Sequence, residues 1–427
     1  MKARHACSLV LPVIRWVFVC SLGGLVWAQT EAAGNGREAA PAVAPSTRAE
    51  EIEQQRLRRL QNLAPETTTG TESALVKVRN QKILERFFSG VGGLRARFGG
   101  LATGSGFAFG PEYINRDLAG GELRLRSSAR VSTRGWQLYD VELRAPNLFN
   151  NRLFASAGAV HRNFGGVNYF GPGADSNREG RSTYRLEDTN SSFAVGVRPS
   201  RALSLGITGG FLQVNVGPGI DRRFASSETI YTPQQAPGID RQTDFLHAGL
   251  LAQYDSRDIP GGPRHGTLAL VRMEHFKDMD LERFSFRRLT AEVQQYVPVF
   301  NDRRVFALRA RTVLSYENAG QRVPFYLQPH VGGSDDIRGF RPFRFYDDHS
   351  LVMNAEYRWE VFAGLDAAIF ADAGKVFARR SQLNLHDLET AVGFGLRFNA
   401  RNDVFLRIDT GFSHEGFQVW FKFNNVF

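Results

Sequence analysis

Arg338 lies within VGGSDDIRGFRPFRF, a stretch rich in glycine and phenylalanine that runs from Val331 to Phe345. Its guanidinium carries five N–H donors in a fixed plane and a permanent positive charge. Gly332 and Gly333 permit backbone angles that other residues avoid, so a tight turn can direct the side chains that follow. Surface loops rarely carry so many bulky apolar groups, so we expect this stretch to pack inside the protein. A buried arginine then needs acidic partners to offset its loss of water.

Two carboxylates in the segments that follow can supply these partners. Over residues 351–361 the odd-numbered positions are mostly apolar and the even-numbered positions polar, which places Glu356 on the polar face of a strand. In the next segment, FADAG, Asp372 shares one face with Phe370 and Gly374. We expect Glu356 and Asp372 to point into the same polar interior as the loop arginine and to hold it there by charge pairing. This chemistry is structural and not catalytic.

The alternation of apolar and polar residues recurs along most of the chain. From Gly90 onward about sixteen such segments can be placed, an even number that is typical of bacterial outer-membrane barrels. The second is expected over 104–113 and the fifth over 151–163. The predicted fold is therefore all-β, a single transmembrane antiparallel β-barrel over residues 90–427. The arginine-bearing loop follows the eleventh strand and is expected to insert into the lumen.

Arginine is frequent on the predicted interior face, and two interpretations follow. A lumen lined with unpaired cations would form an anion-selective pore. Acidic residues share the same faces, so a lumen of mutually paired Arg, Asp and Glu is favoured. The arginines concerned are Arg124, Arg126, Arg309, Arg311, Arg397 and Arg407.

The loop and the segments after it resemble the BamA and TamA family of outer-membrane assembly proteins, also called bacterial surface antigen barrels, and the two-partner secretion transporters. The family signature is an IRGF or VRGF tip on the sixth extracellular loop, followed by an F-x-D-x-G strand. The resemblance implies a loop folded back into the lumen, with its arginine held by Asp372 and Glu356. The matching residues are Ile337, Arg338, Gly339 and Phe340 in the tip and Phe370, Asp372 and Gly374 in the strand.

Two further stretches are similar to the same family. YDSRDIPGGPRHG, at 254–266, has the pattern of a strand end and a turn, and YFGPGADS, at 169–176, is similar to the long loop near the middle of surface antigen barrels. Four separated matches in the expected order are more specific than one motif. The resemblance covers about residues 90–427 and implies a protein that aids insertion or translocation of proteins or lipids.

The chain before the barrel has a different composition. Residues 1–28 have the pattern of a signal peptide, because basic residues precede an apolar stretch that ends in Val-Trp-Ala. Residues 29–89 are expected to be a periplasmic linker with short helices over 47–63 and 74–88. This linker has neither the length nor the alternating strands and helices of the periplasmic POTRA domains of BamA and TamA. We therefore predict a POTRA-less member, which lacks the family's usual client-docking module.

The last predicted strand, GFQVWFKFNNVF, places alternate apolar residues on one face and ends on an aromatic residue. It resembles the C-terminal signal that outer-membrane barrels present to the assembly machinery. Five glycines between Gly90 and Gly100 weaken the first strand. Two poorly matched closing strands would permit the barrel to open sideways, although glycine is also ordinary at a barrel start. The residues of the predicted signal are Gly416, Val419, Phe421 and Phe427.

Charge and motif content argue against nucleic-acid binding and catalysis. The formal net charge is +10, but the arginines alternate with apolar residues along strands instead of forming a basic face. The sequence has no G-x-S-x-G nucleophile elbow and no cluster with metal-ligand spacing. We therefore predict no catalytic residue, no metal and no cofactor, and a hydrolase site built from barrel residues is the alternative left open. Both cysteines, Cys7 and Cys20, lie in the predicted signal peptide.

These observations predict a protein of the bacterial outer membrane with its N-terminal segment in the periplasm. The expected partners are outer-membrane lipid, the assembly machinery that inserts the barrel, and a protein or lipid client. The alternative function is a passive pore or surface receptor that retains only the family's barrel.

Overall fold

The computed structural model describes residues 92–300, 303–400 and 403–423. The chain divides into two units, and the described residues all belong to the second, Thr68–Phe427. The predicted signal peptide, the linker with its helices and the lack of POTRA domains concern residues 1–89, outside the described part. Phe427 of the predicted C-terminal signal also lies outside it.

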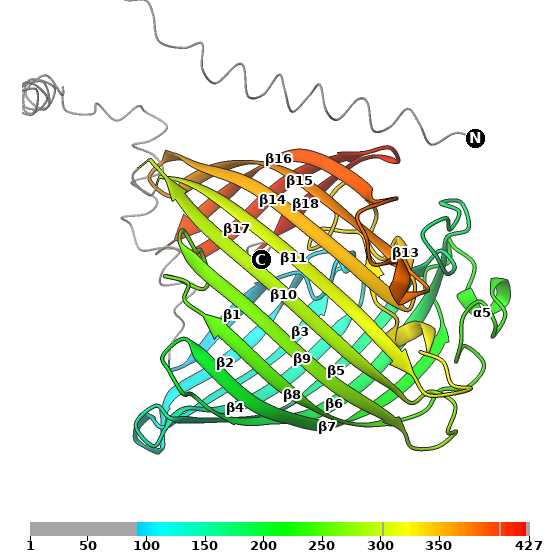
Figure 1. Cartoon of the computed structure of the whole chain (residues 1–427), viewed down its shortest axis with the longest axis horizontal. Helices are drawn as coiled ribbons and strands as arrows, with labels where there is room; N and C mark the ends of the chain where they lie inside the picture. Colours follow the sequence, from blue (N-terminus) through cyan, green and yellow to red (C-terminus); the bar gives the residue numbers. More distant parts are fainter. Residues whose placement is uncertain (1–91, 301–302, 401–402, 424–427) are drawn as a thin grey trace, which may run out of the picture. The chain divides into compact units, whose positions relative to one another are not determined.

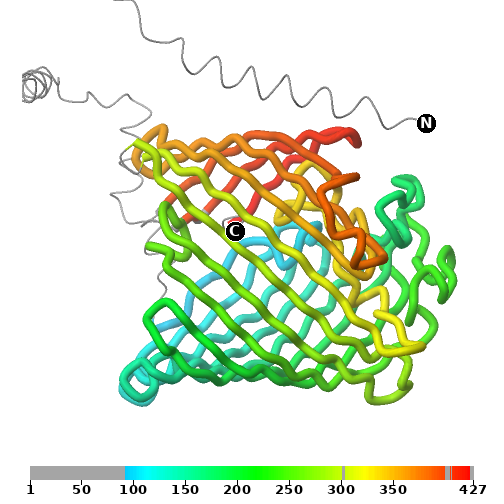
Figure 2. The backbone as a smooth tube through the Cα atoms, viewed as in Figure 1, coloured from blue at the N-terminus to red at the C-terminus, as the bar shows by residue number. Residues whose placement is uncertain are grey.

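Sixteen antiparallel strands form one sheet that curls into a barrel (Figures 1 and 2). Each strand pairs with the next in sequence, except that β11 pairs with β14 across an inserted hairpin. The predicted fold class and strand count are confirmed. The strands are β1 Leu94–Gly99, β2 Ala108–Leu118, β3 Leu123–Ser132, β4 Gln137–Leu148, β5 Leu153–Tyr169, β6 Ser182–Val197, β7 Leu203–Pro218, β8 Phe245–Asp255, β9 Gly266–Asp278, β10 Phe286–Val299, β11 Arg304–Glu317, β14 His349–Phe362, β15 Leu365–Phe377, β16 Glu389–Ala400, β17 Asp403–Ser413 and β18 Gly416–Lys422.

The two faces of the sheet have opposite chemistry, as the period-two pattern requires. On β16, Val392 and Phe394 are 53% and 57% exposed, whereas Arg397 is 1% exposed. Apolar side chains therefore point outward and charged side chains inward, the reverse of a water-soluble protein. This is the arrangement of a barrel whose outer face contacts lipid.

The connections between strands are longer at one end of the barrel than at the other. The longest, 219–244 and 318–348, lie at the same end, which identifies that end as extracellular because bacterial barrels have short periplasmic turns. No helix in the described part of the chain has the length and apolar composition to cross a membrane. The short elements of the connections are η1 Ala119–Gly121, α5 Ser227–Ile230, η2 Phe325–Leu327, β12 His330–Val331, β13 Phe345–Tyr346 and η3 Arg380–Gln382.

An aromatic core fills the barrel near its extracellular end. The Tyr169 ring lies 5.2 Å from the Phe325 ring and 5.1 Å from the Tyr346 ring, and both contacts are edge-to-face. Trp136 stacks on Phe164 with ring centroids 4.8 Å apart. Strands β4 and β5 and the 318–348 connection all contribute to this core, so the connection is packed against the wall.

Several strand ends differ from the predicted ones, and β2 and β5 show two physical reasons. β2 begins at Ala108 instead of 104, because Gly104 and Gly106 adopt positive φ angles of 89° and 80° that a strand does not permit. β5 continues to Tyr169 instead of ending at 163, past an irregularity in its pairing with β6 between Phe164 and Val167. Such a bulge adds residues to one strand and increases its bend.

Candidate functional site

The loop at 332–344 is closed by a short hairpin. His330 and Val331 of β12 pair with Tyr346 and Phe345 of β13, so both ends of the loop leave from one point. Gly332 and Gly333, with φ angles of 115° and 110°, start the turn. A Cβ atom on Gly332 would lie 2.7 Å from the Arg341 carbonyl oxygen, so the turn is closed to other residues.

Arg338 is fully buried, and the structure brings it together with both predicted carboxylates. Its Nε and Nη2 donate to the two oxygens of Asp372 at 2.8 and 2.7 Å, and its Nη1 donates to Glu356 Oε2 at 2.7 Å. The backbone N–H of Arg338 also donates to Asp372 at 3.0 Å. The Arg338 Cζ lies 3.3 Å from the centroid of the Phe370 ring. Four donors and one aromatic face therefore fix the position of this side chain.

The carboxylates that contact Arg338 are themselves shared with arginines of the wall. Glu356 Oε1 accepts from Arg358 Nε at 2.7 Å and from Arg397 Nη2 at 2.9 Å. Arg397 Nη1 continues to Asp409 Oδ1 at 2.5 Å. The network thus extends over β14, β15, β16 and β17. It contains four arginines and four carboxylates, and Lys422 joins it through Asp335; the eight residues are Arg338, Arg358, Arg397, Arg407, Asp335, Glu356, Asp372 and Asp409.

The tip of the loop packs directly on the backbone of β17, where two glycines face each other. A Cβ on Gly411 would lie 2.5 Å from the carbonyl carbon and oxygen of Arg338. A Cβ on Gly339 would lie 2.8 Å from the carbonyl carbon of Phe412. Because both near atoms belong to the backbone, neither position has room for a side chain. This contact explains why position 339 of the predicted loop motif is a glycine.

Apolar members of the loop also face the wall. Ile337 and Phe340 are fully buried and belong to a cluster with Val352 of β14 and Val376 of β15. Gly374, the last residue of the FADAG segment, lies under the loop, since a Cβ there would approach the Ile337 side chain to 3.2 Å. Burial of these groups adds hydrophobic stabilisation to the charge pairs.

The loop reaches the last strand of the barrel as well. Trp420 of β18 donates from Nε1 to the carbonyl oxygen of Arg338 at 2.8 Å. Ser413 Oγ donates to the Gly339 carbonyl oxygen at 2.8 Å, and Lys422 Nζ lies 3.3 Å from Asp335 Oδ2. The loop therefore joins β14 and β15 to the closing strand.

The 169–176 stretch, singled out by its similarity to a family loop, lies against the arginine loop. Arg344 Nη2 donates to the Ser176 carbonyl oxygen at 2.7 Å, and Arg344 Nε donates to Glu415 at 2.8 Å. The Gly173 N–H donates to the Tyr346 carbonyl oxygen at 2.7 Å. Two of the four family-like stretches thus contact each other. The 254–266 stretch forms the periplasmic turn from β8 to β9, where Arg264 lies 3.3 Å from Asp366.

Burial shifts the pKa of two side chains in or beside the loop, Asp336 and His330. Burial raises the pKa of the Asp336 carboxyl to about 6, although Arg311 and Arg309 attract its ionised form. Burial and the nearby charges of Arg311 and Arg288 lower the pKa of His330 to about 4. His330 is therefore neutral at pH 7.

The first and last strands meet without a ladder in the described part of the sheet. There, β1 pairs only with β2, and β18 pairs only with β17. A Cβ on Gly99, the last residue of β1, would lie 3.4 Å from the Phe423 Cβ, just after β18. Because adjacent strands run in opposite directions, this contact places 416–422 beyond the end of β1. We call the junction of β1 and β18 the seam.

Gly416, Val419 and Phe421 of the predicted C-terminal signal lie on this closing strand. Phe421 is 64% exposed and Val419 46% exposed, so both point outward from β18, and Gly416 begins the strand with a φ angle of 114°. Trp420 points the other way, toward the loop.

Sequence reasoning missed several residues of the site. Arg397 and Arg407 are predicted for the inner face but not for contact with the loop network, and Asp409 joins the same network. Trp420 and Ser413 were not singled out. The signal for Trp420 is its even position on a strand whose odd positions are apolar, which assigns it to the lumen. Among residues 92–300, 303–400 and 403–423, no group of three or more His, Cys, Asp or Glu side chains is placed to hold a metal ion.

Comparison with known proteins gives one family match and several similar structures. The Omp85 superfamily domain matches residues 117–401. BamA from Haemophilus ducreyi, in a crystal structure lacking POTRA domains 1–3, is similar with a TM-score of 0.57 and 14% identity over 87% of this chain and 81% of that one. CdiB from Escherichia coli is similar with a TM-score of 0.51 and 11% identity over 77% of this chain and 62% of that one. No curated protein sequence matches the chain.

Proposed function

The chain belongs to the Omp85 superfamily, and on that premise we propose that this outer-membrane barrel inserts or translocates a protein or lipid client at its seam. The loop that carries Arg338 holds β14–β17 in shape while the seam opens. Arg338, Glu356 and Asp372 act as loop anchors and perform no catalysis.

The contrast in strand pairing carries this proposal. Every neighbouring pair from β1–β2 to β17–β18 forms a hydrogen-bonded ladder, whereas β1 and β18 form none within the described residues. An unpaired strand edge offers N–H and C=O groups to an incoming chain. In the described part of the sheet, a client strand or a lipid would enter between β1 and β18 without breaking a ladder.

The filled lumen supports this function over that of a passive pore. The loop occupies the interior beside β14–β17, and its arginine pairs with carboxylates of the wall. The aromatic core packs the extracellular connections against the wall. A plugged barrel of this kind is expected to give small, flickering openings in a planar bilayer, whereas a large, steady, ion-selective current would favour the pore.

The function is tested first by comparing the outer-membrane proteome and lipids of cells with and without the gene. Loss of a defined set of barrel proteins, surface proteins or lipids would support the proposal and identify the clients. An unchanged membrane would contradict it.

The role of the seam is tested with a disulfide. In the double variant Gly99→Cys and Phe423→Cys, the two Cβ atoms lie close to the ~3.5–4.5 Å separation of natural disulfides. We expect the oxidised variant to lose the ability to restore the missing outer-membrane components. Reduction in the same cells should recover it.

A matched pair separates locking of the seam from cross-linking in general. Leu250 and Met273 are direct partners on β8 and β9, so the variant Leu250→Cys with Met273→Cys links two strands that are already paired. This control should retain activity in both redox states. Full activity of the oxidised seam variant, with its cross-link verified on a non-reducing gel, would rule out opening at the seam.

A further inference from the structure

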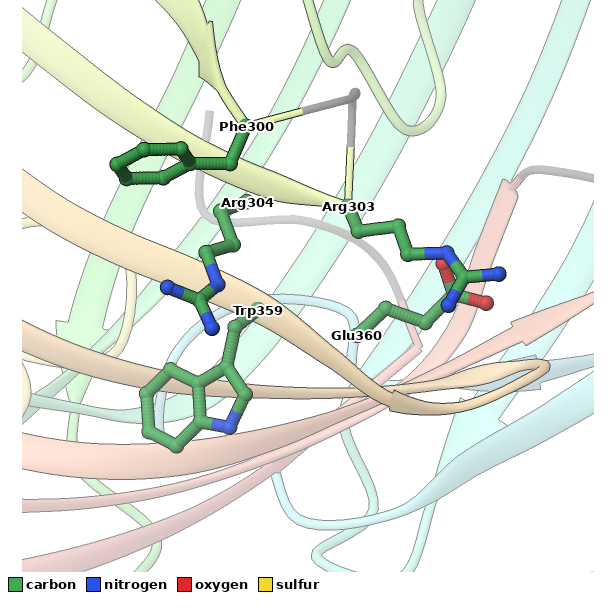
Figure 3. Close-up of a pocket in the computed structure, with 5 residues that line it drawn as sticks. All are labelled: Phe300, Arg303, Arg304, Trp359 and Glu360. Carbon is green, nitrogen blue, oxygen red and sulfur yellow. The ribbon is translucent and has the colours of Figure 1, made fainter. Parts of the chain in front are cut away.

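A pocket of about 460 Å³ lies at the periplasmic end of the barrel, away from the loop and the seam. It is formed where the turn from β10 to β11 meets the end of β14, and it falls within the ~300–1,000 Å³ range of ligand pockets. Phe300, Arg303, Arg304, Trp359 and Glu360 line it (Figure 3).

One side of this pocket belongs to the lipid-facing surface. Arg304 and Trp359 are direct partners on β11 and β14 and therefore share a face of the sheet. Two residues further along β11, Phe306 is 44% exposed, and its ring lies 4.9 Å from that of Tyr357. The Tyr357 ring in turn stacks on Trp359 at 5.8 Å. Arg304 and Trp359 hence point outward with the apolar side chains.

The chemistry of this outer face changes in the order of bilayer depth. Arg304 and Trp359 stand at the periplasmic edge, the aromatic pair Phe306 and Tyr357 follows, and Leu308, which is 45% exposed, comes next. Two residues of a tilted strand advance by roughly 5 Å along the membrane normal. Aromatic residues mark the interface of the bilayer, so Arg304 lies at the depth of the lipid phosphates.

The charge of Arg304 has no acidic partner within the part of the chain that the structure describes. Within the described residues, no ion pair or hydrogen bond of its guanidinium is found, and its Cζ lies 5.7 Å from the exposed Phe300 ring. In Figure 3 the side chains of Phe300, Arg304 and Trp359 point to one side, whereas those of Arg303 and Glu360 point to the other. The carboxylate of Glu360 is thus not directed at Arg304.

We propose that this pocket binds one glycerophospholipid of the periplasmic leaflet, with its phosphate on Arg304 and its glycerol and upper acyl chains against Trp359 and Phe300. A guanidinium presents paired N–H donors that match two phosphate oxygens, and a phosphate at the bilayer surface supplies the missing counter-charge. The acyl chains continue over the aromatic and aliphatic surface of β11 and β14. The site is independent of the seam and of its proposed function.

The test is native mass spectrometry of the purified full chain, delipidated in detergent and titrated with dioleoyl-phosphatidylethanolamine. In the variant Arg304→Gln, the first bound phospholipid should dissociate about ten-fold more readily, the effect of one charge-assisted hydrogen bond. Arg304→Lys, which retains the charge, should recover most of the affinity. Dioleoylglycerol, which has the same chains without phosphate, should bind wild type and Arg304→Gln equally weakly.

Arg201→Gln is the matched control. Arg201 is an exposed arginine of the periplasmic turn between β6 and β7, so this variant makes the same charge change away from the pocket. It should bind the phospholipid like wild type. Equal binding by Arg304→Gln and Arg201→Gln, or binding of dioleoylglycerol as tight as that of the phospholipid, would overturn the proposal.

Discussion

The wall behind the arginine loop and the seam are built in opposite ways. β14 and β15 have 14 and 13 residues, pair along nearly their whole length and share a network of buried charge pairs with the loop. β1 and β18 have six and seven residues, and their described parts lie past each other. Both regions belong to the same sheet, but within the described residues β14 and β15 are joined by a ladder, whereas β1 and β18 are not paired with each other.

The proposed function requires a barrel that retains its shape while its seam opens, and the difference between the two regions fits this requirement. Loss of one partner from a buried charge pair strongly destabilises a protein, because the remaining charge is buried without a counter-charge and without water. A network of this kind holds one arrangement of β14–β17. Within the described residues, β1 and β18 share no ladder, and β18 is joined to the loop through Trp420 and Lys422. We therefore expect an opening between β1 and β18 to leave the network of β14–β17 intact.

Replacement of Arg338 should have the largest effect on stability, because it removes the centre of the loop network. Arg338→Ala leaves Glu356 and Asp372 buried with fewer cationic partners, and we expect a loss of about 3–5 kcal/mol in the free energy of unfolding. Function should fall in parallel. Urea unfolding in detergent micelles and heat-modifiability on gels measure stability, and recovery of the deleted strain's membrane components measures function.

A second arginine of the lumen provides the control for this variant. Arg311 has a side chain 39% exposed and lies 3.8 Å from Glu292, so Arg311→Ala should cost below about 1 kcal/mol. If both variants lose the same stability, or if Arg338→Ala behaves as wild type in both measurements, the loop network is not what fastens this side of the barrel.

The next largest effect concerns Asp336 and depends on pH. Its pKa is raised by burial to about 6, so the ionised carboxyl costs stability as the pH rises from about 4 through 6. Asp336→Asn removes this cost. The variant should be more stable than wild type above pH 6, by up to roughly 3 kcal/mol, and the gain should vanish below pH 4. Urea unfolding at pH 8 and pH 4 tests the sign, and a gain that persists unchanged at pH 4 would contradict this explanation.

Gly411→Ala tests how closely the loop is fitted to β17. The new methyl group would overlap the carbonyl group of Arg338, so the loop backbone must move, with an expected cost of about 1–3 kcal/mol. The control is Gly217→Ala on β7, where an added Cβ meets nothing within 4 Å. Equal stability of the two variants in urea unfolding would show that the loop tip adapts without cost.

Much of this wall could be predicted from sequence, because period-two alternation fixes both the strands and their faces. The same alternation assigned Glu356 and Asp372 inward, so a buried arginine nearby had few other partners. The similarity of IRGF and FADAG to a known signature then identified Arg338 as the arginine that these two carboxylates hold. Local pattern and pairing pointed to the same answer.

The contacts of Trp420, Ser413 and Arg344 could not be predicted in this way. Each depends on which residues stand opposite one another across several strands, and that is set by the stagger of the closed barrel. A bulge such as the one in β5 changes this stagger and also the face on which later residues lie, because Phe164 and Val167, three positions apart, both face the core. The meeting of the 169–176 stretch with Arg344 is likewise a result of loops closing over one end.

The smallest expected effect lies where the two regions meet. Trp420 lies on β18, the last strand of the seam, and its Nε1 donates to the Arg338 carbonyl oxygen. This hydrogen bond therefore links the seam to the arginine loop. Trp420→Phe removes this hydrogen bond and retains most of the ring, which should cost about 1 kcal/mol in urea unfolding. If the bond restrains β18, the variant should form the Gly99→Cys and Phe423→Cys cross-link more slowly, because the strand samples more positions. An unchanged rate of cross-linking would mean that loop and seam are mechanically separate, and the fastened wall would then serve only to keep the barrel folded.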